Sequence, residues 1–287
     1  MTSAIEHKAI LGPCKKLTDA GFEIVFLPVD SLGHVSVEAA KAAINEHTLL
    51  VSIQAANNEI GTIQPVAEIA EFAHQNGAFV HCDAAQGVGK IPVNVYELGV
   101  DLLSISAHKL YGPKGVGALY IRGGIKGVPI EPLFFGGGQE HDIRSGTSNV
   151  PGIVGFGEAC RISKDMLQDE SGQIKELRDH FEGQLLENID SLRINAYQAD
   201  RLPNTSSLTF HGIDADALLL NMPELMLGTG SACTSGAIEP SHVLQAIGLS
   251  REDAYSTIRV CFGRFTTKDE IEIAVKIITY AWKSLAK

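Results

Sequence analysis

The sequence predicts an α/β protein in which a mostly parallel sheet lies between helices, followed by a smaller α+β domain. Three apolar runs read as buried strands, and they span His47–Ile53, Ala78–Cys82 and Leu102–Ile105. A helix-like segment connects the first two runs, beginning at Pro65 and ending at Gly77, with its apolar residues on one face. Because strands that are apolar throughout are buried on both faces, we expect helices on both faces of this sheet.

The pattern changes after about residue 165, and we expect a large domain at residues 1–165 and a small one at residues 166–287. The second part contains a charged helical stretch at Gly172–Ile189 and a strand at Thr257–Phe262. Its closing helix carries an apolar stripe and begins with Thr267 and Glu270, which have the spacing of a capping box.

The composition is that of a globular protein, and it argues against several functional classes. A net charge of −11 and a pI near 5.3 leave no basic stripe for nucleic acid. No apolar run approaches the ~18 residues of a membrane span. The five cysteines contain no Cys-x-x-Cys pair, which argues against a disulfide framework or a zinc site. Residues 1–20 lack the layout of a secretory signal, so we expect a cytoplasmic protein, with organelle targeting left open.

The most informative stretch is Ser106-Ala-His108-Lys109, which a glycine-rich turn follows, and Asp83 closes an apolar run 26 residues (109 − 83) before Lys109. Pyridoxal phosphate (PLP) requires this pair of groups, because a lysine amine binds its aldehyde covalently and an acid keeps its pyridine nitrogen protonated. Ser106 and His108 can bond its phosphate. Lys109 and Asp83 fall just past strand ends, where ligands bind in parallel sheets, so the sequence predicts a PLP site.

Other interpretations of these residues stay open. Lys109 can be a solvated lysine beside a turn. Asp83 can cap a helix that starts at residue 84, and this role is compatible with binding the pyridine nitrogen of the cofactor. Gln86 follows Asp83 by three residues and would bond the phenolic oxygen of the cofactor.

Cys233 lies in Gly228–Gly236, a run of Gly, Ser, Thr and Ala that offers little apolar surface to bury a thiol against. An exposed thiol suits nucleophilic sulfur chemistry, and the alternative is an inert loop cysteine. We expect the other cysteines to be buried as small hydrophobic residues, namely Cys14, Cys82, Cys160 and Cys261.

Arg259 lies in the middle of an apolar strand, where a charge must meet either a buried carboxylate or the carboxylate of a ligand. Asn58 is a natural amide partner for the same ligand group, or else a structural turn residue. The glycine-rich segment that ends at Thr147 either holds a phosphate through that hydroxyl or is a surface turn.

Seven motifs occur in an order that resembles one enzyme family across residues 1–287: Glu6–Lys8, Asn57–Gly61, His81–Gln86, Ser106–Lys109, Arg144–Thr147, Gly230–Ser235 and Ile258–Thr266. The chain is similar to cysteine desulfurases of the iron–sulfur cluster assembly type. These are class V aminotransferase-like enzymes with the fold-type I architecture of PLP-dependent transferases.

The resemblance implies a conversion of L-cysteine to L-alanine, with a persulfide formed on Cys233 for an iron–sulfur scaffold or another acceptor protein. It implies that Lys109 holds PLP, that Asp83 pairs with the pyridinium and that Gln86 meets the ring oxygen. It further implies the following roles: His7 stacks on the ring and assists proton transfer, Asn58 binds the cofactor and, together with Arg259, the substrate carboxylate, and Thr147 reaches the neighbouring subunit's cofactor phosphate in a homodimer.

Family members begin with roughly a further quarter of chain, which holds the small-residue loop that cradles the PLP phosphate at a helix start. We expect this sequence to be either an incomplete product or a natural short form. Two alternative functions follow, a selenocysteine lyase and a catalytically silent, truncated relative that acts as an interaction protein.

Overall fold

The computed structural model describes residues 1–229 and 239–286, and the chain falls into two compact units that each take up several segments. The first unit comprises Met1, Ala40–Ala55 and Pro65–Leu167, and the second comprises Thr2–Ala39, Ala56–Gln64 and Gln168–Lys287. The chain passes for the last time from the first unit to the second between Leu167 and Gln168, close to the predicted domain boundary between residues 165 and 166. The second unit also takes in two segments that the sequence analysis assigned to the large domain.

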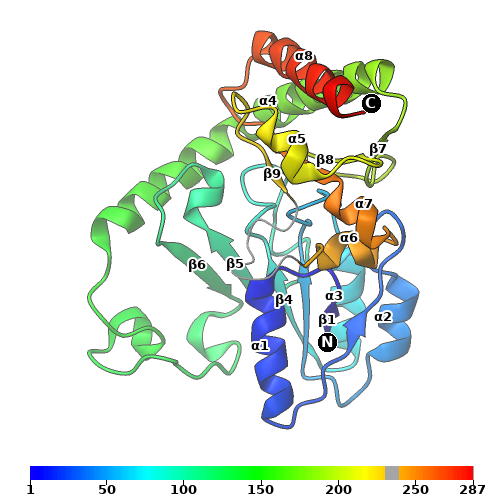
Figure 1. Cartoon of the computed structure of the whole chain (residues 1–287). Helices are drawn as coiled ribbons and strands as arrows, with labels where there is room; N and C mark the ends of the chain where they lie inside the picture. The colour runs from blue at the N-terminus through cyan, green and yellow to red at the C-terminus, as the bar shows by residue number, and fades with distance from the viewer. Residues whose placement is uncertain (230–238, 287) are drawn as a thin grey trace. The chain divides into compact units, whose positions relative to one another are not determined.

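The sheet of the first unit has the order β3-β4-β5-β6 (Figure 1). Its strands are β3 (Leu50–Gln54), β4 (Phe79–Asp83), β5 (Leu102–Ser106) and β6 (Gly117–Ile121). The first three run parallel and β6 runs antiparallel to β5. The three apolar runs therefore predicted β3, β4 and β5 to within three residues at each end, and the mostly parallel sheet is confirmed.

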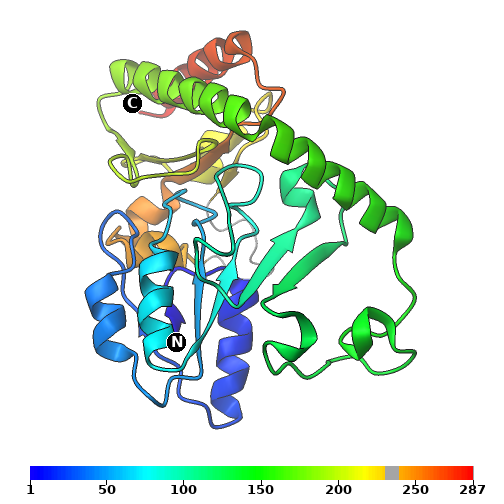
Figure 2. The ribbon, with the colours of Figure 1, turned by 180° about the vertical axis from the view of Figure 1, so that it is seen from behind.

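Helix α3 (Val66–Gln75) connects β3 to β4 and lies against both strands, as the cyan helix in Figure 2 shows. Its buried residues form one face, because apolar side chains recur every three to four residues: Val66, Ile69, Ala70 and Ala73. Pro65 is the cap of this helix and not its first residue, and Gly77 follows it with a φ of 78°. The predicted helix is therefore confirmed within one residue at its start.

The long helix α4 (Val150–Asn188) differs most from the prediction, since it begins 22 residues before Gly172. Pro151, Gly152, Gly155 and Gly157 lie in its first turns, and these residue types disfavour helix interiors. Proline is tolerated in a first turn, where its missing N–H leaves no helical hydrogen bond unmade. Packing explains part of the remainder, because Phe156 and Ala159 of this helix are buried against Ala107 and Leu110.

The second unit contains an antiparallel sheet with the order β7-β8-β10-β9. Its strands are β7 (Leu192–Ile194), β8 (Thr205–Phe210), β9 (Gly228–Thr229) and β10 (Thr257–Cys261). The strands β1 (Thr2–Ser3) and β2 (Phe26–Leu27) pair in parallel and continue the strand order of the other sheet, as β2-β1-β3-β4-β5-β6. The helices of the second unit are α1 (Lys8–Asp19), α5 (Ala215–Leu220), α6 (His242–Ala246), α7 (Arg251–Tyr255) and α8 (Lys268–Leu285). Helix α2 (Val37–Ala43) and three short 3-10 turns complete the elements of the described residues: Ala107–Leu110, Gly124–Lys126 and Gln139–Asp142.

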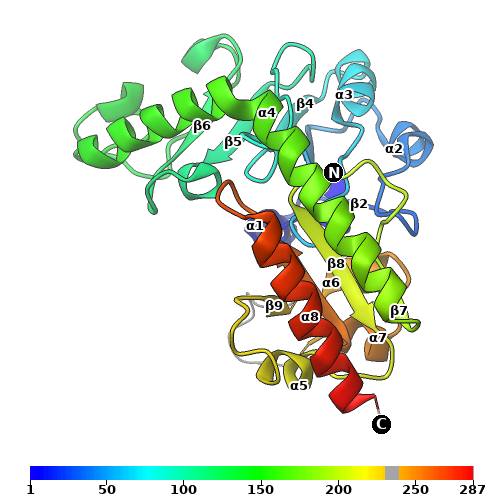
Figure 3. The ribbon, with the colours of Figure 1, turned by 90° about the horizontal axis from the view of Figure 1, so that it is seen from above.

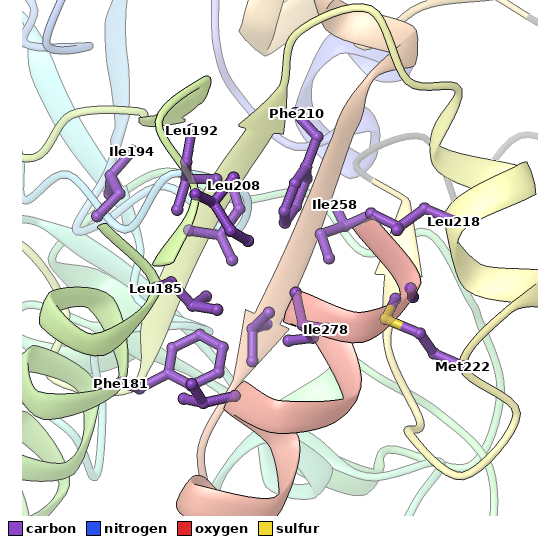
Figure 4. Packing of buried hydrophobic residues seen from close by; sticks show 14 of the residues in the cluster. Phe181, Leu185, Leu192, Ile194, Leu208, Phe210, Leu218, Met222, Ile258 and Ile278 are labelled. Atoms are coloured by element: carbon purple, nitrogen blue, oxygen red, sulfur yellow. The ribbon is translucent and has the colours of Figure 1, made fainter. Parts of the chain in front are cut away.

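Helix α8 and the C-terminal part of α4 lie side by side across this antiparallel sheet (Figure 3). The capping box predicted for α8 is present, since the Thr267 side chain accepts from the Glu270 N–H and the Glu270 carboxylate accepts from the Thr267 N–H. One continuous apolar core joins both helices to the strands, and Figure 4 shows Phe181, Leu185, Leu208, Phe210, Ile258 and Ile278 within it. Full burial of one such side chain contributes roughly 1.5–3 kcal/mol, so this core holds the second unit together.

Two further sequence expectations are tested by the described residues. Among these residues, no helix combines the length and the apolar character that crossing a bilayer requires. Of the four cysteines expected to be buried, Cys82 is buried, Cys14 and Cys160 are partly exposed and Cys261 is exposed. The expectation is therefore confirmed for Cys82, holds only in part for Cys14 and Cys160, and is wrong for Cys261, which is the last residue of β10 and exposed.

Candidate active site

Asp83 is the last residue of β4, and the parallel strands β3 and β5 end beside it. In register, Asp83 lies between Gln54 of β3 and Ser104 of β5. Its side chain is half-buried, and Oδ1 accepts a hydrogen bond from the Ala85 N–H at 3.0 Å. The alternative prediction of a helix cap is wrong in one respect, since residues 84–90 form turns and no helix.

His81 lies two residues before Asp83 and therefore on the same face of β4. Its Nδ1 is 2.8 Å from Ser52 Oγ and its Nε2 is 2.9 Å from Ser104 Oγ, so the ring links all three parallel strands. Burial lowers the pKa of His81, and the charge of Asp83 only partly opposes this. The His81 ring thus joins the ends of the three strands beside the Asp83 carboxylate, through the hydroxyls of Ser52 and Ser104.

Lys109 lies in the 3-10 turn that follows β5, and its side chain is exposed. The turn ends at Tyr111, which has a left-handed φ of 66°. A Cβ at Gly112 would come within 2.9 Å of the Ala107 carbonyl oxygen, and one at Gly117 would overlap the Ile105 carbonyl oxygen. The glycines are therefore required for the chain to fold back closely around the lysine.

Four further residues predicted on the cofactor side also belong to the first unit, whereas Asn58, predicted to bind cofactor and substrate, belongs to the second. The Ser106 hydroxyl is 3.0 Å from His108 Nδ1, which places two polar groups beside the lysine turn. Gln86 lies in the turn after β4, and its Oε1 accepts from Lys90 Nζ at 3.1 Å. Thr147 is exposed on the segment that leads into α4.

The donor set of the first unit fits PLP. A primary amine follows β5 directly and a carboxylate ends the neighbouring strand β4, which are the two groups that the aldehyde and the pyridine nitrogen require. Hydroxyl, imidazole and amide groups lie in the two turns that follow these strands. Within the described residues, no group of three or more His, Cys, Asp or Glu side chains gathers as it would around a metal ion.

The residues predicted on the substrate side lie in the second unit. Asn58 is in the turn of residues 57–61, and its backbone carbonyl accepts from Arg259 Nη1 at 2.9 Å. Both side chains are partly exposed, so the guanidinium is held at the turn while part of it faces solvent. His7 is the N-cap of α1, where its Nδ1 accepts from the Ala9 N–H at 3.2 Å. The structure thus places Asn58 and Arg259 together.

The sequence analysis missed the buried groups that hold these residues. Asn57 Nδ2 donates to the Ile5 carbonyl at 2.9 Å, and its Oδ1 accepts from the N–H groups of Glu59 and Ile60 at 2.8 and 3.0 Å. The next carbonyl along, that of Glu6, is 2.9 Å from His242 Nε2. The segment before His7 is therefore tied to the Asn58 turn and to α6. The available signal was the polar run that starts at Asn57, directly after a buried strand.

Glu59 is the one acid of this turn, and it is 6% exposed. The Ser241 hydroxyl donates to Glu59 Oε2 while it accepts from the N–H groups of Val243 and Leu244 as the N-cap of α6. Burial raises the pKa of Glu59 to about 7, although the Ser241 hydrogen bond and the charges of Arg259 and Lys8 lower it. Burial also lowers the pKa of His242.

The predicted nucleophile Cys233 lies outside the described residues. The described chain stops at Thr229, the end of β9, and resumes at Glu239, two residues before Ser241.

Comparisons with known proteins show the family to which the chain belongs. A family model described as aminotransferase class-V matches residues 1–273. A cysteine desulfurase IscS of Dictyoglomus turgidum is 46% identical over 97% of this chain and 70% of its own length. A mitochondrial cysteine desulfurase of Arthroderma benhamiae is also 46% identical over 97% of this chain, but over 55% of its own length.

Solved structures give the same result. A NifS-like protein is 39% identical with a TM-score of 0.89, over 99% of this chain and 74% of its own. A structure titled SspA in complex with cysteine is 36% identical with a TM-score of 0.78, over 93% of this chain and 74% of its own. Such identities over nearly the whole chain show its family. The chain belongs to the cysteine desulfurases of the class-V aminotransferase family.

Proposed function

We propose that this chain acts as a PLP-dependent cysteine desulfurase, which converts L-cysteine to L-alanine and leaves a persulfide on Cys233. The observation that carries the proposal is the position of Asp83 and of the Lys109 turn at the carboxyl ends of neighbouring parallel strands. Relatives named cysteine desulfurase support it, since they match nearly the whole chain. The chain spans about 70% of the length of the first of these relatives.

The first unit would hold the cofactor. When bound, PLP supplies an electron sink for the bond changes at the substrate carbons. Asp83 would keep the pyridine nitrogen protonated, and Gln86 would donate its amide to the ring oxygen. Ser106 and His108 would bond the phosphate, and the Lys109 amine would hold the cofactor and then carry a substrate proton.

The second unit would hold the substrate. The Arg259 guanidinium can take a carboxylate with two parallel hydrogen bonds, and the Asn58 amide can donate a third. His7 would lie over the cofactor ring and assist proton transfer. These roles suit partly or fully exposed side chains whose backbone is fixed by buried neighbours.

Cys233 would carry the sulfur. Its thiolate attacks the substrate sulfur, so that a sulfur–sulfur bond forms as the carbon–sulfur bond breaks. The electron pair of the broken bond stays with the carbon side, and protonation there yields alanine. L-Cysteine and one thiol thus become L-alanine and one persulfide, with no further oxidant or reductant. The persulfide would then pass to an iron–sulfur scaffold or another acceptor protein.

A homodimer follows from the role proposed for Thr147, whose hydroxyl would reach the phosphate in the neighbouring subunit. Apolar side chains are exposed on both sides of Thr147 along the chain, with Leu133 at 87%, Phe135 at 82% and Val154 at 67% exposure. Large apolar groups exposed together favour a protein interface. Sedimentation equilibrium of the full chain tests this, with a mass of two chains as the expected result.

The location that we propose is cytoplasmic. The mitochondrial cysteine desulfurase among the relatives makes an organelle the alternative, and fractionation of the source cells distinguishes the two.

The experiment follows alanine, sulfide and the mass of the Cys233 peptide after the chain is incubated with PLP and L-cysteine. We expect alanine and a persulfide on Cys233. The Cys233→Ser variant should lose both and retain the absorbance of bound PLP, whereas the matched control Cys261→Ser, at an exposed cysteine, should behave as the wild type.

Two other outcomes would replace the proposal. A much faster release of selenide from selenocysteine than of sulfide from cysteine would identify a selenocysteine lyase. A colourless protein that forms no alanine would identify a catalytically silent relative.

A further inference from the structure

A buried junction in the second unit joins the Asn58 turn to the start of α6 through Glu59. The Glu59 carboxyl accepts from the Ser241 hydroxyl across 182 residues of sequence, and both residues are 6% exposed. The Ser241 oxygen is also the N-cap of α6, with the Val243 and Leu244 N–H groups at 3.1 and 3.3 Å. The Glu59 carboxyl is therefore held by the Ser241 hydroxyl, which is itself held by two backbone N–H groups of α6.

The same turn presents the proposed substrate residues. Arg259 Nη1 donates to the carbonyl of Asn58, the residue directly before Glu59. The backbone of Glu59 is fixed from the other side, since its N–H donates to Asn57 Oδ1 and Asn57 is anchored to Ile5. Arg259 and Glu59 are therefore attached to the same turn, and the charge of Arg259 acts on the Glu59 carboxyl.

The charged and titratable groups around this carboxyl come from four segments. Arg259 on β10 and Lys8 at the start of α1 are cationic, and both lower the pKa of Glu59. His242 on α6 has a pKa that burial lowers. Glu6 and His7 lie directly before Lys8 in the chain, and Glu239 lies two residues before Ser241.

We propose that Glu59 is a positioning residue that adjusts the affinity of Arg259 for the substrate carboxylate through its own protonation state. This inference rests on the proposed function. A protonated carboxyl leaves the full charge of the guanidinium to the substrate. An ionised carboxylate attracts the same guanidinium and repels the substrate anion, so substrate binding weakens.

The direction of the pH effect follows from the pKa near 7. Glu59 is mostly protonated at pH 6 and mostly ionised at pH 8. KM for L-cysteine should therefore rise with pH through 7, on the order of five- to tenfold, whereas kcat should change little, because Glu59 is proposed to act on binding alone.

The first part of the test does not depend on activity. The carboxyl carbon of Glu59 is followed by NMR against pH in protein labelled with ¹³C-glutamate and assigned by its absence in Glu59→Gln. We expect a midpoint near 7 that moves upward in Arg259→Gln, because a neighbouring cation favours the ionised acid. A midpoint near 4.5, or one that does not move in Arg259→Gln, would overturn the inference.

The second part compares KM and kcat for L-cysteine between pH 5.5 and 8.5 with PLP present. Glu59→Gln should lose the rise in KM that the wild type shows, while the control Glu176→Gln, at an exposed acid of α4, should retain it. Ser241→Ala removes the hydrogen bond that lowers the pKa of Glu59. The rise in KM should therefore occur at higher pH in this variant than in the wild type. This variant also serves if Glu59→Gln does not fold.

The outcomes separate this inference from the proposed function. An active Glu59→Gln enzyme with the pH profile of the wild type would overturn the inference alone. Absence of alanine from the wild type would overturn the proposed function and the substrate step that rests on it.

Discussion

The first unit places its predicted site residues at the ends of regular strands, whereas the second holds them by side-chain hydrogen bonds between distant segments. Asp83 and the Lys109 turn follow β4 and β5, so the backbone ladder sets their positions. The Asn58 turn depends instead on Asn57, Glu59 and the groups that these bind, and the Arg259 side chain, which extends from β10, is held at this turn by its hydrogen bond to the Asn58 carbonyl. We therefore expect substitutions around the first set to change chemistry with little change in stability, and substitutions beneath the second to change both.

The largest expected effect belongs to the first unit. Lys109→Ala should lower alanine formation by at least about a thousandfold, because covalent and proton-transfer roles are both removed. The melting temperature should change little, since the side chain is exposed. Lys114→Ala is the matched control, at an exposed lysine five residues further along the chain, and should retain activity. Equal activity of the two variants would contradict the role of Lys109.

The second unit should respond in stability to the loss of Asn57. Asn57→Ala removes three buried hydrogen bonds, which join its side chain to the Ile5 carbonyl and to the N–H groups of Glu59 and Ile60. The free energy of unfolding should fall by about 3 kcal/mol, measured by urea denaturation. Asn188→Ala, which removes one exposed hydrogen bond, should cost less than about 1 kcal/mol. Similar losses from both variants would show that the junction does not stabilise the unit.

Glu59 provides a test of the same junction by pH. Its pKa is about 7 in the folded protein against an ordinary value of 4.5, so the folded state binds the proton more tightly. Stability therefore falls as pH rises from about 5 to 8, by roughly 3 kcal/mol from this group. Glu59→Gln should remove that fall, seen as the difference between the two unfolding free energies at each pH. A difference that stays constant with pH would contradict the raised pKa.

The smallest effect is expected beneath Asp83. Ser52→Ala removes one hydrogen bond of His81 and leaves the one to Ser104. The unfolding free energy should fall by about 1 kcal/mol, and alanine formation should change less than twofold, because the strand ladder still holds Asp83. A large loss of activity with unchanged stability would instead assign His81 a direct part in the chemistry.

The sequence was sufficient for features that depend on neighbours along the chain. The apolar runs gave β3, β4 and β5, and strand order then placed Asp83 and Lys109 at one edge of a parallel sheet. The capping box of α8 was predicted for the same reason, since Thr267 and Glu270 lie three residues apart.

Features that depend on contacts between distant residues could not be predicted. The Glu59–Ser241 hydrogen bond joins residues 182 positions apart, and no periodicity reports such a pairing. The start of α4 was missed because its glycines disfavour a helix, whereas packing of Phe156 stabilises one. The segments 2–39 and 56–64 join the second unit for the same reason, since their partners lie far along the chain.

The most direct test of the account is the site of cofactor attachment. The native chain is incubated with PLP and reduced with borohydride, and its peptides are analysed by mass spectrometry. The account predicts a single pyridoxyl group on Lys109 and none on Lys114. A chain without the label, or one labelled equally on exposed lysines, would contradict it.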